Sequence, residues 1–142
     1  METKQSSDMF HLDTNVIIDA IRGKYPHLVA CFEKNNSSDI AISTVVVAEL
    51  EFGAAHSDNY EKRRKQYLDF IAPYKIIPFT EKEAVVYGQI REQLTRKGTA
   101  IGPNDLLIAA IAIANGATLV THNTNEFSRV HGLSLVDWRS EE

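Results

Sequence analysis

Short hydrophobic runs alternate with longer segments of helical spacing along the 142 residues of this chain. A short apolar run bounded by polar residues is typical of a buried strand. Because helical segments separate the runs, the pattern predicts strand–helix–strand crossovers and an α/β fold, with a mainly parallel central sheet of four to five strands flanked by helices on both faces. The runs are Met9 to Leu12, Ile40 to Ile42, Lys75 to Phe79, Thr118 to Thr121 and Leu133 to Val136.

Helix signals occupy the segments between these runs. Thr14 and Asn15 are residue types that cap helix N-termini, and Gly23 is a typical stop for the helix that follows them. Pro103 suits the first turn of a helix that ends before Gly116. The remaining predicted helices cover Pro26 to Glu33, Asn59 to Ile71, Glu81 to Lys97 and, after Pro103, Leu106 to Asn115.

One segment carries conflicting signals. Ser43 and Thr44 are suited to cap a helix that continues to Ala55. Val45 to Val47, however, are three β-branched residues in a row, and their stiff side chains favour a strand. We therefore expect a strand first and a helix after it in this region.

Composition and charge narrow the class of protein. Hydrophobic residues make up 44% of the chain and charged residues 24%, so we expect one globular domain over residues 9–142 behind a short flexible leader at residues 1–8. The single cysteine, Cys31, forms no internal disulfide and suits the cytoplasm. Leu106 to Ala114 is too short an apolar run to span a membrane, and the first residues lack the apolar core of a secretion signal. A net charge of −4 argues against a strongly basic nucleic-acid binder.

Polar residues fall where a parallel sheet collects functional groups, beyond the carboxyl ends of its strands. Asp13 ends the first strand, Asp105 lies in the first turn of the most apolar helix, and Asn123 follows the fourth strand. Glu49 lies one turn after a predicted cap, and Glu126 one turn after Asn123. Structural alternatives exist: a helix cap for Asp13, a favourable helix-dipole position for Asp105, a solvated position for Glu49 and a turn for Asn123.

Four separated blocks carry a resemblance to a known family. They read LDTNVIID, STVVVAELEFG, IREQLTRKGTAIGPNDLLIAA and LVTHNTNEF, in this order, and the similarity extends from Met9 to Trp138. Together they resemble the PIN-domain nucleases and, more narrowly, the VapC toxins of VapBC toxin–antitoxin pairs. The resemblance implies a PIN-domain fold and a metal-dependent nuclease.

The resemblance also implies a role for each candidate residue. Asp13, Glu49 and Asp105 match the acidic residues that hold a divalent metal, Mg²⁺ or Mn²⁺. Asn123 falls at the fourth catalytic position, where the family frequently has Asp. Because Asn keeps an oxygen ligand and removes a charge, the number of metal ions stays open, as does the question of whether Glu126 compensates.

Other matched positions are expected to support the site or to contact RNA. Thr121 matches a Ser/Thr position beside the site, and Asn15 a position that orders the loop after the first strand. Arg91 matches an Arg common in the VapC subgroup, and Arg96 and Lys97 lead into the segment before the acidic helix. Side chains of this kind hold RNA phosphates without reading the sequence. The basic run at residues 62–65 has the same chemistry, with a solvated helix face as its alternative.

The expected chemistry follows from the residue types. Carboxylates crowded together repel one another, which raises at least one pKa unless a cation offsets their charge. Hard oxygen ligands select Mg²⁺ or Mn²⁺, and such a metal lowers the pKa of a water nucleophile. Hydrolysis by that route leaves a 5′-phosphate and a 3′-hydroxyl, and it needs no histidine.

The resemblance implies the toxin of a type II toxin–antitoxin system, an endoribonuclease that cuts structured RNA and so inhibits translation. The expected substrate is tRNA, with ribosomal RNA as the other target. The expected partners are a second copy of the chain, a cognate VapB antitoxin, and operator DNA through the antitoxin alone. The alternative function is a catalytically silent PIN-like scaffold, although a scaffold has no need of buried like charges. Receiver and haloacid-dehalogenase-like patterns are not present.

The C-terminal arm of the antitoxin is expected to wrap the toxin and block the acidic pocket. The amphipathic first helices offer apolar residues for such an arm, and the same residues are equally suited to the core. These residues are Ile17, Ile18, Ile21, Tyr25 and Leu28.

Overall fold

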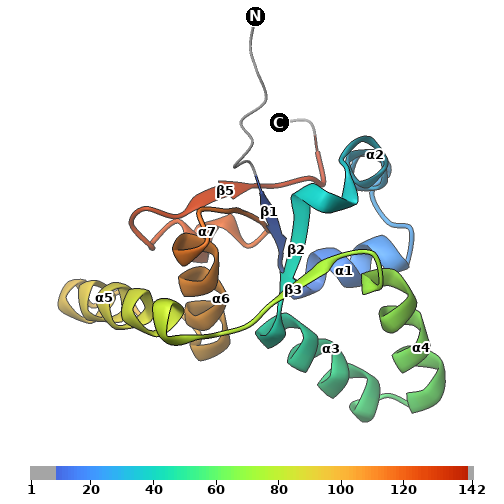
Figure 1. Cartoon of the computed structure of the whole chain (residues 1–142), viewed down its shortest axis with the longest axis horizontal. Helices are drawn as coiled ribbons and strands as arrows, with labels where there is room; N and C mark the ends of the chain where they lie inside the picture. Colours follow the sequence, from blue (N-terminus) through green and yellow to red (C-terminus); the bar gives the residue numbers. More distant parts are fainter. Residues whose placement is uncertain (1–8, 141–142) are drawn as a thin grey trace, which may run out of the picture.

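The computed structural model describes residues 9–140, whose five strands form one parallel sheet (Figure 1). Their order is β3-β2-β1-β4-β5, and every neighbouring pair is parallel. The α/β sheet predicted from the alternation is confirmed. The leader expected at residues 1–8 lies outside the described residues. The strands are β1 (Phe10–Leu12), β2 (Ile40–Ser43), β3 (Lys75–Ile77), β4 (Thr118–Val120) and β5 (Ser134–Val136).

Helices cover both faces of the sheet, as predicted. The chain moves outward from β1 to β2 to β3 and then returns past β1 to β4. Right-handed crossovers therefore place the helices before β3 on one face and those after β3 on the other. Figure 1 shows α5, α6 and α7 on one side of the strands and α1, α2 and α4 on the other. The helices are α1 (Thr14–Ile21), α2 (Pro26–Lys34), α3 (Thr44–His56), α4 (Tyr60–Ile71), α5 (Glu81–Lys97), α6 (Pro103–Ala114), α7 (Thr124–Phe127) and the 3-10 helix η1 (Ser37–Asp39).

The strand expected at Val45 to Val47 is wrong, because these residues form the first turns of α3. Ser43 caps that helix, its hydroxyl oxygen accepting a hydrogen bond from the Val46 backbone N–H at 3.2 Å. Val46 is completely buried in the core. The cap and the burial of one valine outweigh the modest preference of β-branched residues for strands.

Other differences concern the ends of elements. Asp13, rather than Thr14 or Asn15, is the N-cap of α1. The polar stretch after the fourth strand, interpreted as a turn, contains the short helix α7. Local propensity does not fix the ends of helices to the residue, which explains these differences.

Helix α6 is the most buried helix and packs against α5 and β4. The longest hydrophobic run in the sequence therefore belongs to the core of the protein. Within residues 9–140, no helix is long and apolar enough to cross a membrane. The buried residues of α6 are Leu106, Ile108, Ala109, Ala110, Ile111 and Ala112.

A buried carboxylate joins the N-terminus of α5 to the C-terminus of α6. Glu83 is only 2% exposed, and one of its oxygens accepts from the Thr80 backbone N–H at 2.8 Å and from the Thr80 hydroxyl. Its other oxygen accepts from the Asn115 side-chain amide at 2.9 Å. Burial by itself would raise its pKa, but these donors outweigh that effect and lower the pKa of Glu83 to about 2.

Candidate active site

The site begins at the point where the strand order reverses, between β1 and β4. Ligand sites of open parallel sheets lie beyond the carboxyl ends of the strands at this position. Asp13 follows β1 directly and Thr121 follows β4 directly. The Asp13 backbone N–H donates to the Val120 carbonyl at 3.0 Å, which extends the β1–β4 pairing up to the site.

Asp13 is buried, and hydrogen bonds hold both of its carboxylate oxygens. One accepts from the Thr14 backbone N–H at 2.9 Å, and the other from the Thr121 hydroxyl at 2.8 Å. Burial raises the pKa of Asp13, the two hydrogen bonds oppose the rise, and the negative charge of Glu49 adds to it. Asp13 therefore both caps α1 and presents a fixed carboxylate to the site, so the two interpretations of this residue are compatible.

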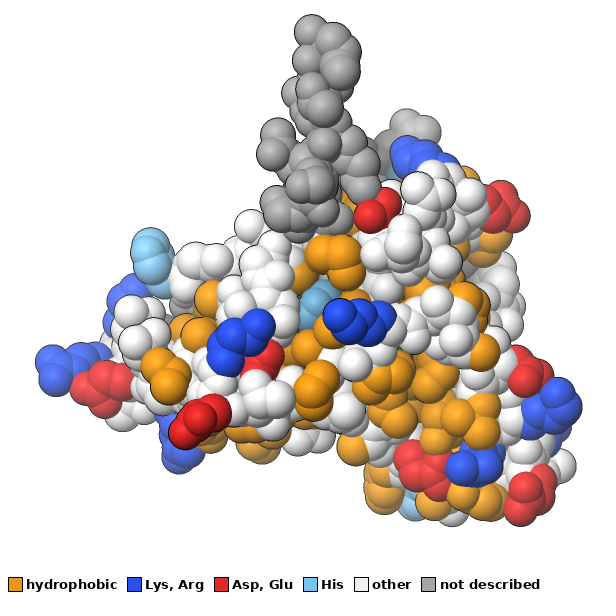
Figure 2. Space-filling model, viewed as in Figure 1, with side chains coloured by type: hydrophobic (Ala, Val, Ile, Leu, Met, Phe, Trp, Pro, Cys, Tyr) orange, Lys and Arg blue, Asp and Glu red, His pale blue; other side chains and the backbone are white. Residues whose placement is uncertain are grey.

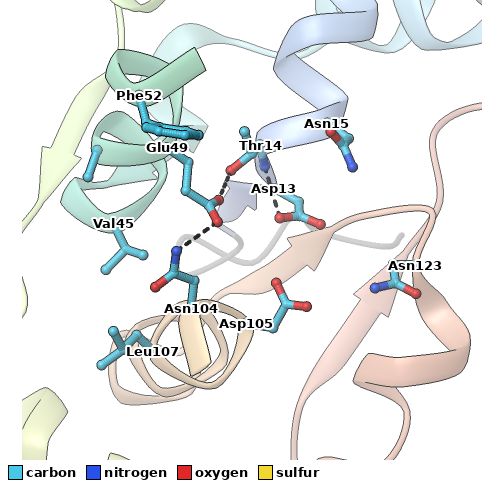
Figure 3. A pocket seen from close by; sticks show the side chains of 11 residues that line it. Asp13, Thr14, Asn15, Val45, Glu49, Phe52, Asn104, Asp105, Leu107 and Asn123 are labelled. Atoms are coloured by element: carbon cyan, nitrogen blue, oxygen red, sulfur yellow. Dashed lines mark hydrogen bonds between the residues drawn. The ribbon is translucent and has the colours of Figure 1, made fainter. Parts of the chain in front are cut away.

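Asp105 projects from the first turn of α6 toward Asp13 (Figure 3). Burial and the nearby charges of Asp13 and Glu126 raise the pKa of Asp105 to about 7. Asp105 and Glu126 are direct neighbours, and each carboxyl group influences the pKa of the other. A carboxylate in such a position is unfavourable unless a proton or a cation offsets its negative charge.

Glu126 lies in this acidic group, where the sequence had suggested only a compensating role. The Gly102 backbone N–H donates to one of its oxygens at 2.8 Å, and the Asn123 side-chain amide donates to the other at 2.8 Å. These bonds lower the pKa of Glu126. Asn123, the residue at the fourth family position, lines the same pocket and orients Glu126 through its amide group.

Glu49 reaches the pocket from α3 and is held by two polar neighbours (Figure 3). Its carboxylate accepts a hydrogen bond from the Thr14 hydroxyl and another from the Asn104 side-chain amide at 3.0 Å. The sequence predicted no site role for Thr14, which it indicated only as a helix cap, or for Asn104. Their neighbours Asp13 and Asp105 were the available signal, because residues beside two catalytic candidates face the same loop region.

Asp13, Glu49, Asp105 and Asn123 line an open pocket of about 660 Å³. Its polar wall contains the acidic residues and Asn15, which lies in the first turn of α1. Its apolar wall consists of Val45 and Phe52 on α3 and Leu107 on α6. The pocket therefore combines a strongly negative side with a hydrophobic side.

The donor set fits a hard divalent cation. All of the candidate ligand atoms are carboxylate or amide oxygens, the type that Mg²⁺ and Mn²⁺ prefer. Gly102 lies against both carboxylates, since a Cβ there would make ordinary van der Waals contact at 3.7 Å with an oxygen of Asp105 and of Glu126. Within residues 9–140, no three acidic, histidine or cysteine side chains form a complete metal-binding group, and Glu49 is bound instead to Thr14 and Asn104.

The basic residues expected to contact RNA lie on α5, away from the residues that line the pocket. Arg91 is exposed and donates to the Tyr87 hydroxyl at 2.9 Å. Arg96 pairs with Glu92, and Lys97 is exposed at the end of the helix. Their role in RNA binding stays a prediction.

A second hollow, of about 430 Å³, lies between α1, α3 and α4 and shares Glu49 with the acidic pocket. Ile18 and Ile21 line it, whereas Ile17 and Leu28 are completely buried. Only part of the apolar set expected to form a groove is therefore available on the surface. Figure 2 shows hydrophobic side chains gathered over the α3–α4 part of the molecule.

Comparisons with known proteins agree with this architecture. A PIN-domain family model matches residues 11–133. The chain is 41% identical over 133 residues to ribonuclease VapC2 of Rickettsia felis, covering 92% of this chain and 98% of the relative. It is 37% identical over 129 residues to the tRNA(fMet)-specific endonuclease VapC of Salmonella typhimurium, covering 91% and 97%.

A solved structure gives the same answer. The crystal structure of VapBC2 from Rickettsia felis, bound to a DNA fragment from their promoter, matches with a TM-score of 0.85 at 41% identity, covering 92% of this chain and 98% of that one. The chain therefore belongs to the PIN-domain family and, within it, to the VapC ribonucleases. This confirms the resemblance drawn from the sequence and the enzyme class. PIN-domain nucleases in general depend on a divalent metal.

Proposed function

We propose that this chain is the toxin of a type II toxin–antitoxin system and acts in the cytoplasm as an Mg²⁺- or Mn²⁺-dependent endoribonuclease that cuts tRNA and thereby inhibits translation. The observation that carries the proposal is the gathering of Asp13, Glu49 and Asp105 in an open pocket, with Glu126 next to Asp105. Burial and the neighbouring negative charges raise the pKa of Asp105 to about 7. Like charges gathered in this way destabilise a fold unless a cation offsets them, so the arrangement serves chemistry rather than folding.

In this proposal Asp13, Glu49 and Asp105 hold the metal, and Glu126 and Asn123 complete the acidic site. When bound, the metal supplies a more acidic water and positive charge beside the phosphodiester. Hydrolysis adds the water oxygen to phosphorus and breaks the bond to the 3′ oxygen, which leaves a 5′-phosphate and a 3′-hydroxyl.

Polar neighbours orient the acidic side chains for this task. The Thr121 hydroxyl and the Thr14 N–H fix the two oxygens of Asp13. The Gly102 N–H fixes Glu126. Asn15, which lines the pocket beside them, is proposed to order the loop after β1. Because each orienting bond keeps a carboxylate in a single position, the site is organised before substrate arrives.

The choice of tRNA is supported by the name of the Salmonella relative, a tRNA(fMet)-specific endonuclease. The acidic pocket by itself repels a polyanion, so basic side chains outside it must hold the RNA backbone. We assign this role to Arg91, Arg96 and Lys97, which lie exposed on α5. Ribosomal RNA is the second substrate to test.

The proposed partners follow the same relatives. A cognate VapB antitoxin is expected to lay its arm in the hollow between α1, α3 and α4, where Ile18 and Ile21 offer apolar contacts beside Glu49. Operator DNA is then bound through the antitoxin alone, as in a complex of the kind solved for the Rickettsia felis pair with promoter DNA. We also propose that the toxin is a homodimer.

The test is cleavage of total tRNA by purified protein with Mg²⁺ or Mn²⁺, with and without a chelator. We expect cuts at one site, 5′-phosphate ends, and loss of cleavage in Asp13→Asn and Asp105→Asn. Asp69→Asn is the matched control, because Asp69 is exposed on α4 and pairs only with Lys65 among the described residues.

Each outcome has a distinct meaning. Intact tRNA would redirect the search to ribosomal RNA. If tRNA and ribosomal RNA both stay intact while the protein still binds the metal, the silent scaffold is favoured. Products with 5′-hydroxyl ends would contradict the proposed hydrolysis.

A further inference from the structure

The most exposed large hydrophobic side chain of residues 9–140 stands at the edge of the acidic pocket. Phe52 is 68% exposed, and it lines the pocket together with Asp13 and Asp105. It lies three residues after Glu49 on α3, so the helix presents both side chains on one face. Figure 3 shows its ring beside the Glu49 side chain. An exposed phenyl ring at a functional pocket contributes nothing to the core.

A second ring extends this surface. The His56 ring stacks on Phe52, with centroids 5.5 Å apart and an angle of 15° between the planes. His56 is also exposed, one helical turn further from the acidic side chains. The two nearly parallel rings form an exposed aromatic stack, which we call the Phe52–His56 platform.

The two sides of the pocket suit the two parts of a nucleotide, its phosphate and its base. Its acidic side suits a metal and therefore a phosphate, while Val45, Leu107 and Phe52 make its other side apolar. Proteins recognise unpaired RNA bases by stacking them on exposed aromatic side chains. A nucleotide whose phosphate lies at the acidic side would place its base on the apolar side.

We propose that the Phe52–His56 platform is a nucleobase subsite, which stacks an unpaired base next to the scissile phosphate. This inference rests on the proposed ribonuclease function and adds a determinant of where the RNA is cut. Stacking accepts any base, so the platform selects an unpaired nucleotide rather than a particular sequence. It explains how a pocket without basic lining residues positions RNA for cleavage.

The experiment uses a synthetic RNA stem-loop that contains the cleavage site mapped in total tRNA, and copies with an abasic nucleotide on either side of that site. Steady-state kcat and KM are measured for the wild-type protein, Phe52→Ala and Phe52→Trp. Val85→Ala is the matched control, because Val85 is 58% exposed on α5 and does not line the pocket.

We expect Phe52→Ala to raise KM for the intact RNA by about 5- to 150-fold, the range for loss of one stacked base. One of the abasic RNAs should show the same loss with the wild-type protein and no further loss with Phe52→Ala. Phe52→Trp should keep near-wild-type kinetics, and Val85→Ala should change nothing. Because the Phe52 side chain is mostly exposed, thermal unfolding should be unaltered.

A direct signal complements the kinetics. With 2-aminopurine at the position identified by the abasic scan, binding in the presence of chelator should quench the fluorescence for the wild-type protein and not for Phe52→Ala. Equal quenching with both proteins would overturn the subsite. So would kinetics in which the loss from Phe52→Ala and the loss from the abasic nucleotide multiply when the two changes are combined. A changed sedimentation coefficient with unchanged RNA kinetics would assign Phe52 to a protein interface instead. If the wild-type protein cleaves no RNA, the proposed function fails first and the subsite with it.

Discussion

Glu83 and Asp105 occupy the same local position in two helices, and the fold treats them in opposite ways. Each is the third residue of its helix, α5 or α6, where the helix dipole favours a negative charge. Glu83 is surrounded by donors from Thr80 and Asn115, and its pKa falls to about 2. Asp105 is partly buried among carboxylates, and burial together with their charges raises its pKa to about 7.

The difference separates a carboxylate that protein donors satisfy from one that lies among like charges. Glu83 is fully satisfied by protein donors and holds α5 against α6. The Asp105 carboxylate is left among like charges, which is unfavourable until a cation binds. Position within a helix is the same in both cases, so the neighbours contributed by distant segments decide which role a carboxylate takes.

The largest expected effect concerns Asp105. Replacing Asp105 with Asn keeps the shape of the side chain and removes its charge, so we expect ribonuclease activity to fall by about a thousandfold, equivalent to several kcal/mol of transition-state stabilisation. The free energy of unfolding should stay the same or rise, because repulsion with Asp13 and Glu126 is relieved. Kinetics on RNA and chemical denaturation would measure the two effects. Reduced stability together with full activity would make Asp105 a second structural carboxylate.

The opposite pattern is expected for Glu83. Glu83→Gln places an amide donor against the donors of Thr80 and Asn115, which should lower the free energy of unfolding by about 2 kcal/mol. Activity well below the melting temperature should be unchanged, since Glu83 is not among the residues that line the pocket. Glu81→Gln, at an exposed position two residues earlier, is the control in the same denaturation series. Comparable losses in both variants would mean that the buried network contributes little.

A smaller effect tests how Asp13 is held. Thr121→Val removes the hydroxyl that donates to Asp13 at 2.8 Å while keeping the side-chain volume similar. We expect the affinity for Mn²⁺ to fall by about tenfold or more, as for other groups that orient metal ligands. Isothermal titration calorimetry would measure this, and Thr121→Ser should restore most of the affinity. Unchanged binding in Thr121→Val would show that Asp13 is positioned by the Thr14 N–H alone.

The smallest effect is a pair of opposite pH trends in metal-free protein. The folded state lowers the pKa of Glu83 from 4.5 to about 2, so the stability that Glu83 contributes is present above pH 4.5 and is lost as the pH falls toward 2. The folded state raises the pKa of Asp105 from 3.8 to about 7, so its contribution is present below pH 3.8 and is lost as the pH rises through 7.

Denaturation in chelator across this range, compared between wild type and variants, would separate the two trends. Glu83→Gln should flatten the dependence below pH 4.5, and Asp105→Asn should flatten it between about pH 4 and 7. A wild-type slope between pH 4 and 7 that survives in Asp105→Asn would have to come from another group.

Much of the fold could be predicted because its signals are local. The alternation of short apolar runs with helical segments predicted four to five strands and the major helices, and Gly98 and Pro103 mark the end of α5 and the start of α6. The failure at Val45 to Val47 has a tertiary cause. Their propensity favours a strand, but the helix cap at Ser43 and the burial of Val46 in the core stabilise a helix instead.

The candidate site could be predicted only in part. Asp13 and Asp105 were identifiable because each lies at the end of a strand or the start of a helix. The contact of Glu126 with Asp105 was not, since it depends on the Gly102 N–H, 24 residues away in the chain. The same holds for Asn104, which meets Glu49 across 55 residues.

The sequence by itself therefore determined the class of fold and the family, and it pointed to the acidic candidates for the site. It could do so because hydrophobic periodicity, capping residues and family motifs depend on residues that are close together in the chain. The tertiary structure alone decided which carboxylates crowd together and which are satisfied by donors. It also decided that Phe52 stands at the pocket edge instead of in the core. Charges and hydrogen bonds act over a few ångströms in space, and only the packing of β1, β4, α3 and α6 brings these distant residues within that range.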